Sequence, residues 1–312
     1  MSGPSLEAIN LSKSYGSFSA LSNLNLKLNG AKCVGFLGPN GAGKTTTMKI
    51  FTGLIASTEG RALINDVDVS EDKKAALSSC TSLIETPEIY PSLTPKEAFV
   101  MLCEMRGVPR EERSKRIAEA LGRVKMQEWE NKKVGSFSKG MKQRVNVAST
   151  LLSDPAVVIL DEPTTGLDPR GMSEVRDIVK SLDDRLVFMS SHLLAEVTDV
   201  CQEVAMIDHG KLIVYDTIGN VTSKFSGNGG AIEVGFSHGV DESTVGKVMR
   251  LEGVQTVTKS NGTHVAVTFS GGLAAQEKLF QQIAELKLGA VSFRQTTGGL
   301  EDAYLKLIKE TL

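Results

Sequence analysis

The chain has 312 residues, of which 41% are hydrophobic and 23% charged, and its formal net charge is −2. This length suggests about two domains, and the composition is that of an ordinary globular protein. A near-neutral charge, one Trp and four Tyr residues argue against a nucleic-acid partner. No apolar run approaches the roughly 18 residues that span a bilayer. The N-terminus lacks a secretion signal, and the four widely spaced cysteines predict reduced, mostly buried thiols in a cytoplasmic protein.

Alternating apolar residues predict strands over residues 6–11 and 21–28. Tyr15 stands in the polar stretch between them, just before the second strand. Its residue type alone favours a turn tyrosine over a ring stacked on a purine.

A phosphate-binding pattern, G-x-x-x-x-G-K-[ST], covers residues 38–45. An apolar run at 33–37 predicts a buried strand before it, and a helical pattern follows it, so backbone N–H groups would face an anion. A dinucleotide fingerprint fails, because Thr46 stands where its third glycine belongs. The residues expected to bind the nucleotide here are Gly38, Pro39, Asn40, Gly41, Ala42, Gly43, Lys44, Thr45 and Thr46. Lys44 would meet the β- and γ-phosphates, and the Thr45 hydroxyl would bind Mg²⁺.

The tract from about 85 to 154 is mainly helical in pattern. Thr94-Pro95-Lys96-Glu97 predicts a helix that starts with a capping box. Ser138 is a plausible N-cap of a later helix, whose N-terminus would then carry free N–H groups near Gly140. Read alone, this second feature is also an ordinary capped helix.

Two predicted strands end in polar residues. Residues 157–160 form an apolar run that is followed directly by Asp161 and Glu162. Asp161 suits the metal side of a phosphate site, and Glu162 is a candidate base for an attacking water. The strand at 186–189 leads to His192, which is expected at the same sheet edge, although a lone His is more often structural. Asp168 is predicted to cap a helix that starts at Pro169.

A boundary is expected near residues 223–230, where Ser, Gly and Asn cluster. Beyond it, the predicted order βαββαβ indicates a ferredoxin-like α+β module, with an extra helix at 300–308.

With these motifs in this order, residues 5–222 resemble an ATP-binding cassette (ABC), the nucleotide-binding subunit of a membrane transporter. The resemblance implies an α/β fold: a P-loop NTPase (RecA-like) core with an antiparallel β subdomain and an inserted helical subdomain at about 86–155. The cassette would occupy residues 1–222, and residues 223–312 would form an accessory or dimerisation domain.

The resemblance also assigns roles to residues. Tyr15 would stack on adenine, and His192 matches the switch histidine that joins Lys44 and Glu162 in catalysis. Glu85 stands at the glutamine-loop position and would join Thr45 and Asp161 at the metal. Phe137-Ser138-Lys139-Gly140-Met141 occupies the place of the Leu-Ser-Gly-Gly-Gln signature, and Asp168 matches the loop after the acid pair. Two cassettes, as a homodimer or a heterodimer, would then trap two MgATP molecules head to tail, each between the cradle of one chain and Ser138 and Gly140 of the other.

Several departures accompany the match. Glu85 replaces a glutamine, and the signature keeps only Ser138 and Gly140. These changes look like those of drug-resistance and sodium-export ATPases, whose C-terminal extension ends in a Leu-Glu-Asp motif similar to Leu300-Glu301-Asp302.

We therefore expect an ATPase at the inner face of the cell membrane. It would power a separate permease that docks near residues 85–102, in an exporter. A cassette that drives a cytosolic machine is the main alternative. A regulatory ATP-binding module without turnover and, more weakly, a phosphotransferase are the others.

Overall fold

The computed structural model describes residues 3–85, 89–225, 229–271, 273–295, 300 and 304. The chain divides into two compact units, Met1–Thr217 and Ile218–Leu312. None of the helices in the described ranges is both long and apolar enough to cross a membrane.

An antiparallel sheet opens the first unit. It contains β1 (Ser5–Tyr15), β2 (Phe18–Asn29), β4 (Glu59–Ile64) and β5 (Val67–Asp68), in the order β2-β1-β4-β5. The first two strands run further than their alternation predicts, because they pair as a hairpin up to Tyr15 and Phe18. Tyr15 is therefore the last residue of a strand, and the expectation that it lies in a loop is wrong.

A six-stranded sheet forms the centre of this unit, in the order β10-β9-β3-β8-β7-β6. Its strands are β3 (Lys32–Leu37), β6 (Cys80–Leu83), β7 (Val157–Leu160), β8 (Leu186–Ser191), β9 (Glu203–Asp208) and β10 (Lys211–Thr217). All neighbours are parallel except β9 and β10. The carboxyl ends of β3, β7 and β8 therefore meet at one edge, which is where ligands bind in such sheets.

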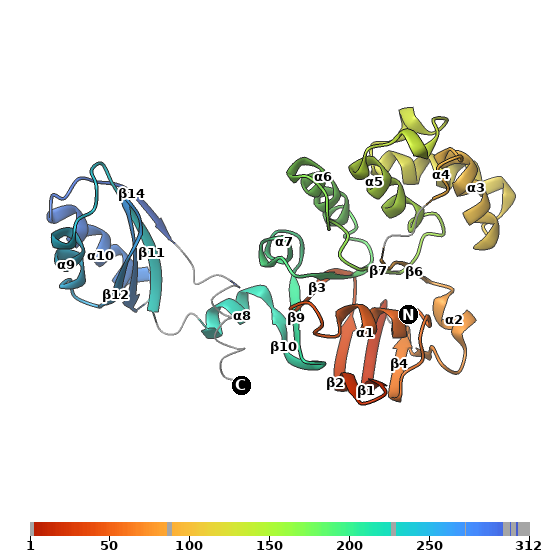
Figure 1. Ribbon diagram of the computed structural model, residues 1–312, viewed down its shortest axis with the longest axis horizontal. Coiled ribbons are helices and arrows are strands. Elements are labelled where there is room, and N and C mark those ends of the chain that lie inside the picture. Colours follow the sequence, from red (N-terminus) through yellow and green to blue (C-terminus); the bar gives the residue numbers. More distant parts are fainter. Residues whose placement is uncertain are drawn as a thin grey trace. The chain divides into compact units, whose positions relative to one another are not determined.

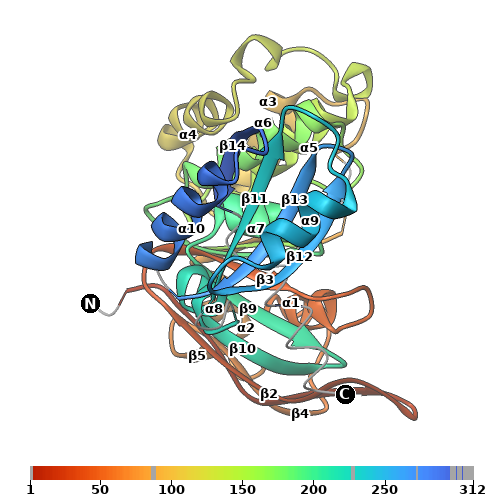
Figure 2. The same ribbon diagram turned by 90° about the vertical axis from the view of Figure 1, so that its left-hand side faces the viewer.

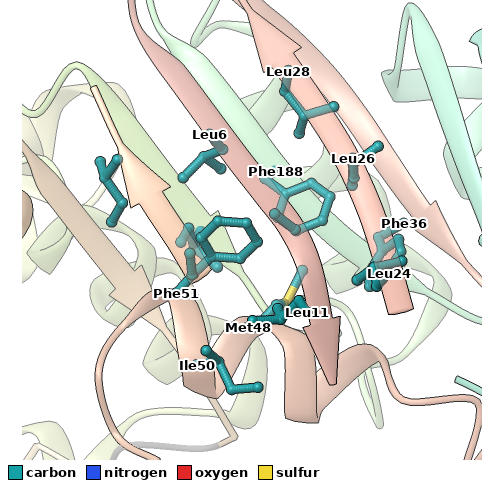
Figure 3. Packing of buried hydrophobic residues seen from close by; sticks show 14 of the residues in the cluster. Leu6, Leu11, Leu24, Leu26, Leu28, Phe36, Met48, Ile50, Phe51 and Phe188 are labelled. Atoms are coloured by element: carbon teal, nitrogen blue, oxygen red, sulfur yellow. The ribbon is translucent and has the colours of Figure 1, made fainter. Parts of the chain in front are cut away.

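A hydrophobic core lies between the two sheets and α1 (Lys44–Phe51). Figure 3 shows many of its side chains gathered there, from the strands of both sheets and from this helix. The Phe188 ring lies 5.0 Å from the Phe36 ring and 6.2 Å from the Phe51 ring, centroid to centroid. This packing fixes the helix that follows the phosphate-binding loop against the strand that precedes it.

Helices α3 (Pro95–Met105), α4 (Arg110–Arg123) and α5 (Lys139–Ser149) group together, as the yellow-green part of Figure 1 shows. Two short 3₁₀ helices, η1 (Gln127–Trp129) and η2 (Val134–Ser136), connect α4 with α5. The predicted capping box of Thr94 and Glu97 is confirmed, with both reciprocal hydrogen bonds present. The remaining helices of the unit are α2 (Lys73–Leu77), α6 (Pro169–Lys180) and α7 (Leu194–Val200).

The second unit contains α8 (Ile218–Phe225), β11 (Gly229–Phe236), α9 (Glu242–Met249), β12 (Val254–Asn261), β13 (His264–Ser270), α10 (Leu273–Glu285) and β14 (Ala290–Gln295). Its sheet has the antiparallel order β12-β13-β11-β14, visible in Figure 2, and α9 and α10 cover one face. This is the predicted ferredoxin-like arrangement. The helix expected at 300–308 lies outside the described residues, apart from residues 300 and 304.

Candidate nucleotide site

The loop between β3 and α1 has the shape of a phosphate cradle. Gly43 has a φ of 106°, a left-handed conformation that only glycine adopts readily. A Cβ at Gly38 would lie 2.3 Å from the Ile207 carbonyl oxygen, so the loop needs glycine to pack on β9. Lys44, 6% exposed, donates from Nζ to the carbonyl oxygens of Gly38 (2.7 Å) and Pro39 (3.2 Å). The loop therefore holds this ammonium group inside its own curve.

Asp161 joins the cradle to the tips of β7 and β8. Its Oδ2 accepts a hydrogen bond of 2.9 Å from Thr45 Oγ1, and its Oδ1 accepts one of 2.6 Å from Ser190 Oγ. The Ser190 hydroxyl in turn accepts a hydrogen bond of 2.8 Å from the Glu162 N–H. These contacts bring together Thr45 and Asp161, two of the three residues predicted to bind a metal.

Glu162 lies between the two other predicted catalytic residues. Its Oε1 is 3.6 Å from Lys44 Nζ, and its Oε2 is 2.6 Å from His192 Nδ1. Thr165 Oγ1 donates a hydrogen bond of 2.9 Å to the same Oε2. The carboxylate is therefore held at the sheet edge by three side chains from separate elements.

A cavity of about 430 Å³ opens in front of these groups. Its lining consists of Tyr15, Phe18, Ala20, Asn40, Gly41, Gly43, Lys44, Thr45, Thr46, Glu162, Thr165 and His192. Tyr15, one of the lining residues, is 49% exposed. The structure thus places the predicted adenine, phosphate and catalytic residues around one space.

Six predicted nucleotide contacts are not among the residues that line this cavity: Gly38, Pro39 and Ala42 of the cradle, and Ser138, Gly140 and Asp168. Ser138 caps α5 by accepting from the Met141 N–H at 3.2 Å, and Asp168 caps α6 by accepting from the Gly171 N–H at 3.1 Å. Both predicted caps are confirmed. The ligand contacts predicted for all of the site residues stay predictions.

Glu85 is engaged elsewhere. Its carboxylate forms an ion pair with Lys49 of α1, and its backbone has a φ of 61°. With Asp161 and Glu162, it lines a second cavity of about 440 Å³. Its role as a metal ligand stays a prediction.

The donor set at Thr45 and Asp161 fits Mg²⁺. Both groups are oxygen donors, which this ion prefers, and Mg²⁺ needs only one or two protein ligands when phosphates and waters supply the rest. The described residues contain no group of three or more His, Cys, Asp or Glu side chains that could hold a metal by themselves. A metal here would therefore bind together with a phosphate.

Three residues of the site were not predicted from the sequence. Phe18 lines the cavity beside Tyr15 and is 62% exposed, and the short turn that separates the two aromatics could have indicated it. Ser190 follows the strand predicted at 186–189, and its hydrogen bond to Asp161 depends on β7 and β8 being neighbours. Thr165 lies three residues after Glu162, and its hydrogen bond to that carboxylate depends on the conformation of the turn after β7.

Known proteins share this organisation. A family model described as "ABC transporter" matches residues 21–165. The bacitracin transport ATP-binding protein BcrA of Bacillus licheniformis is 37% identical over 67% of this chain and 68% of its own length. An uncharacterized ABC transporter ATP-binding protein of Bacillus subtilis, YhcH, is 32% identical over 98% of this chain and 96% of its own. The chain belongs to the family of ABC transporter ATP-binding proteins.

Solved structures agree with the family. An ATP-binding subunit of an ABC transporter has a TM-score of 0.64 and 26% identity, and the match covers 70% of this chain and 92% of that one. A dimeric ATP-binding cassette bound to ADP and Pi has the same fold, with a TM-score of 0.60. This ABC protein is an ATPase, and ATP-binding subunits of its family work with transmembrane permease partners.

Proposed function

We propose that this ABC protein hydrolyses MgATP in the cavity between Tyr15 and His192, with Glu162 as the general base. The observation that carries the proposal is the position of the Glu162 carboxylate, 3.6 Å from Lys44 Nζ and 2.6 Å from His192 Nδ1. A base in that position would meet a water beside a γ-phosphate bound by the cradle.

Each residue then has a separate task. A triphosphate in the cradle would compete with Glu162 Oε1 for Lys44, whose ammonium group would neutralise charge on the transferred phosphoryl group. Glu162 would accept the proton of the attacking water, and His192 would hold the γ-phosphate. Mg²⁺ held by Thr45 and Asp161 would supply further positive charge beside the β- and γ-phosphates.

We propose that a second cassette, identical or not, completes each site. Ser138 and Gly140 lie at the N-terminus of α5, whose first turn contains no acidic residue but does contain Lys139 and Lys142. Cations at the positive end of a helix are unfavourable unless an anion lies nearby. The γ-phosphate of an ATP held by the opposite cassette would be that anion, and Asp168 would lie at the same interface.

A permease would dock on the helical part of this unit. A cavity of about 340 Å³ lies along α3, and its lining includes Tyr90, Met101 and Met105, which are 71%, 50% and 81% exposed. Exposed apolar side chains of this kind mark protein contact sites.

Relatives are named for bacitracin transport, lantibiotic transport and linearmycin resistance. We propose that this protein, held at the inner face of the membrane by its permease, powers export of a compound of such a kind.

Glu162→Gln tests the catalytic part. The variant should bind MgATP like the wild type but release phosphate about 10²–10³-fold more slowly, because one preorganised electrostatic group is lost. It should also form an ATP-dependent dimer that gel filtration detects, and the exposed Glu71→Gln variant serves as a matched control. Wild-type turnover in Glu162→Gln would remove Glu162 from the mechanism. Monomers at saturating MgATP would argue against the composite site and favour a cassette that works without a second copy.

A further inference from the structure

The turn that carries His192 is closed by a buried hydrogen-bond relay. Strand β8 ends at Ser191, and α7 begins at Leu194. The Ser191 hydroxyl accepts a hydrogen bond of 2.9 Å from the Leu193 N–H and donates one of 2.8 Å to Glu196 Oε2. His192 lies between Ser191 and Leu193, so the hydrogen bond between these two residues closes a turn around its backbone.

Glu196 is an unusual residue for its position. It is 2% exposed, and within the described part of the chain its Oε1 has no hydrogen-bond partner. An unsatisfied buried polar atom costs on the order of 1–3 kcal/mol. The neighbouring buried positions of α7 are apolar, namely Val197 and Val200. Packing alone does not call for a carboxylate here, and local violations of this kind concentrate at functional sites.

The rest of α7 is fixed to the sheet and to α6. Val197 packs on β3 where Gly35 has no side chain, since a Cβ there would lie 2.5 Å from Val197 Cγ1. On the exposed side, Asp199 pairs with Lys180 at 2.6 Å and with Arg176 at 3.5 Å. Glu196 therefore projects from a helix whose position is set independently of His192.

His192 has little support of its own. Its side chain is 42% exposed, and among the described residues its recorded hydrogen-bond partner is Glu162. The orientation of the His192 ring is therefore set by the backbone conformation of the turn. That backbone is set by Ser191 on one side and by the start of α7 on the other.

We propose that Glu196 is a positioning residue for His192. By holding the Ser191 hydroxyl, Glu196 fixes the turn so that Nδ1 stays at Glu162 and the other ring nitrogen remains available for the γ-phosphate. This inference rests on the catalytic role proposed for His192. It assigns to Glu196 no contact with nucleotide, metal or water.

A double-mutant cycle on turnover tests the inference. Glu196→Leu removes the acceptor, and kcat should fall about 10- to 100-fold, as expected for a misplaced catalytic group. The KM for MgATP should change by less than about threefold, because the substitution leaves the phosphate-binding cradle unchanged. In a His192→Ala background, Glu196→Leu should have no further effect on kcat. Glu196→Gln should restore most of the activity, because its carbonyl oxygen can still accept from Ser191.

Two further variants keep the test decisive. Asp199→Asn changes a carboxylate to an amide on the same helix and should lower the melting temperature without lowering kcat. Ser191→Ala removes the same hydrogen bond by deleting one atom, and replaces Glu196→Leu if that variant does not fold. Equal losses of kcat from the Glu196 change with and without His192 would overturn the inference alone. Wild-type kcat in His192→Ala would instead overturn the catalytic role on which it rests.

Discussion

The backbone of Glu162 has a φ of 47°, although the residue is not glycine. A left-handed conformation of this kind costs about 1–3 kcal/mol and persists only where the surroundings enforce it. Here the Glu162 N–H donates to Ser190, while Thr165 and His192 contact its Oε2. The strain is consistent with a strand end shaped to aim one carboxylate at the cradle.

Thr165 is expected to matter through its hydroxyl group. Thr165→Val keeps the shape but removes the donor to Glu162 Oε2, and we expect kcat to fall about tenfold, equivalent to about 1.4 kcal/mol. Thr165→Ser keeps the donor and should stay close to the wild type. Phosphate release at saturating MgATP measures both variants. If the Val and Ser variants turn over equally fast, the hydroxyl has no part in orienting Glu162.

Asp161 gives a prediction about the metal. Asp161→Asn removes the charge opposite Thr45, so Mg²⁺ should no longer strengthen ATP binding. Affinity for ATP in the presence of EDTA should remain that of the wild type. Titration of a fluorescent ATP analogue with and without Mg²⁺ measures both quantities. An unchanged effect of Mg²⁺ would show that Asp161 does not hold the ion.

The sequence singled out residues of the site that belong to a local motif. The cradle, the Asp161-Glu162 pair and His192 each follow a predicted strand, and parallel strands place their ends at one edge. Ser190, Thr165 and Glu196 could not be assigned in this way. The Ser190 contacts cross between the ends of β7 and β8, which no local pattern specifies. Thr165 and Glu196 bond to residues only three and five positions away, but these bonds depend on the conformation of the turns after β7 and β8.

Helix α7 and strand β3 are in unusually close contact at Gly35. Besides Val197, a Cβ at this glycine would lie 3.2 Å from Cys201 Sγ. The spacing between β3 and α7 therefore depends on residue 35 being a glycine, which has no side chain. Strand β3 leads into the cradle and α7 follows His192, so a change in this spacing should displace both parts of the site.

Gly35→Ala is expected to lower the free energy of unfolding by about 1–3 kcal/mol, because overpacking forces a stiff β-branched side chain to move. Val197→Ala removes both clashing methyl groups and should restore part of the loss when combined with Gly35→Ala. Urea denaturation of the two single variants and the double variant measures this. Additive losses in the double variant would mean that the clash with Val197 is not the cause.

Elements with a strong apolar pattern of their own were predictable. Strand β7 and the first four residues of β8 are continuous apolar runs, and α3 begins with a capping box. Strand β6 was not predicted, because Cys80-Thr81-Ser82-Leu83 is short and half polar. It forms because β7 offers it a parallel partner. The extension of β1 to Tyr15 has the same origin in pairing with β2.

Two of the hydrophobic clusters among the described residues lie in different units. One gathers around Phe36, Phe51 and Phe188 in the first unit, and the other around Ile232 and Phe269 in the second. The two clusters share no residue. Because cooperative unfolding follows a shared core, each unit should have a transition of its own.

Calorimetry of the full chain should therefore resolve two transitions with different responses. MgATP at about 100 times its Kd stabilises the unit that binds it by about 2.7 kcal/mol, which raises that transition by about 5–10 °C. Ile232→Val, a conservative change in the second core, should lower the other transition by about 4–8 °C through a loss of about 1 kcal/mol. Neither change should move the transition of the opposite unit. A single transition that responds to both changes would mean that the two cores unfold together.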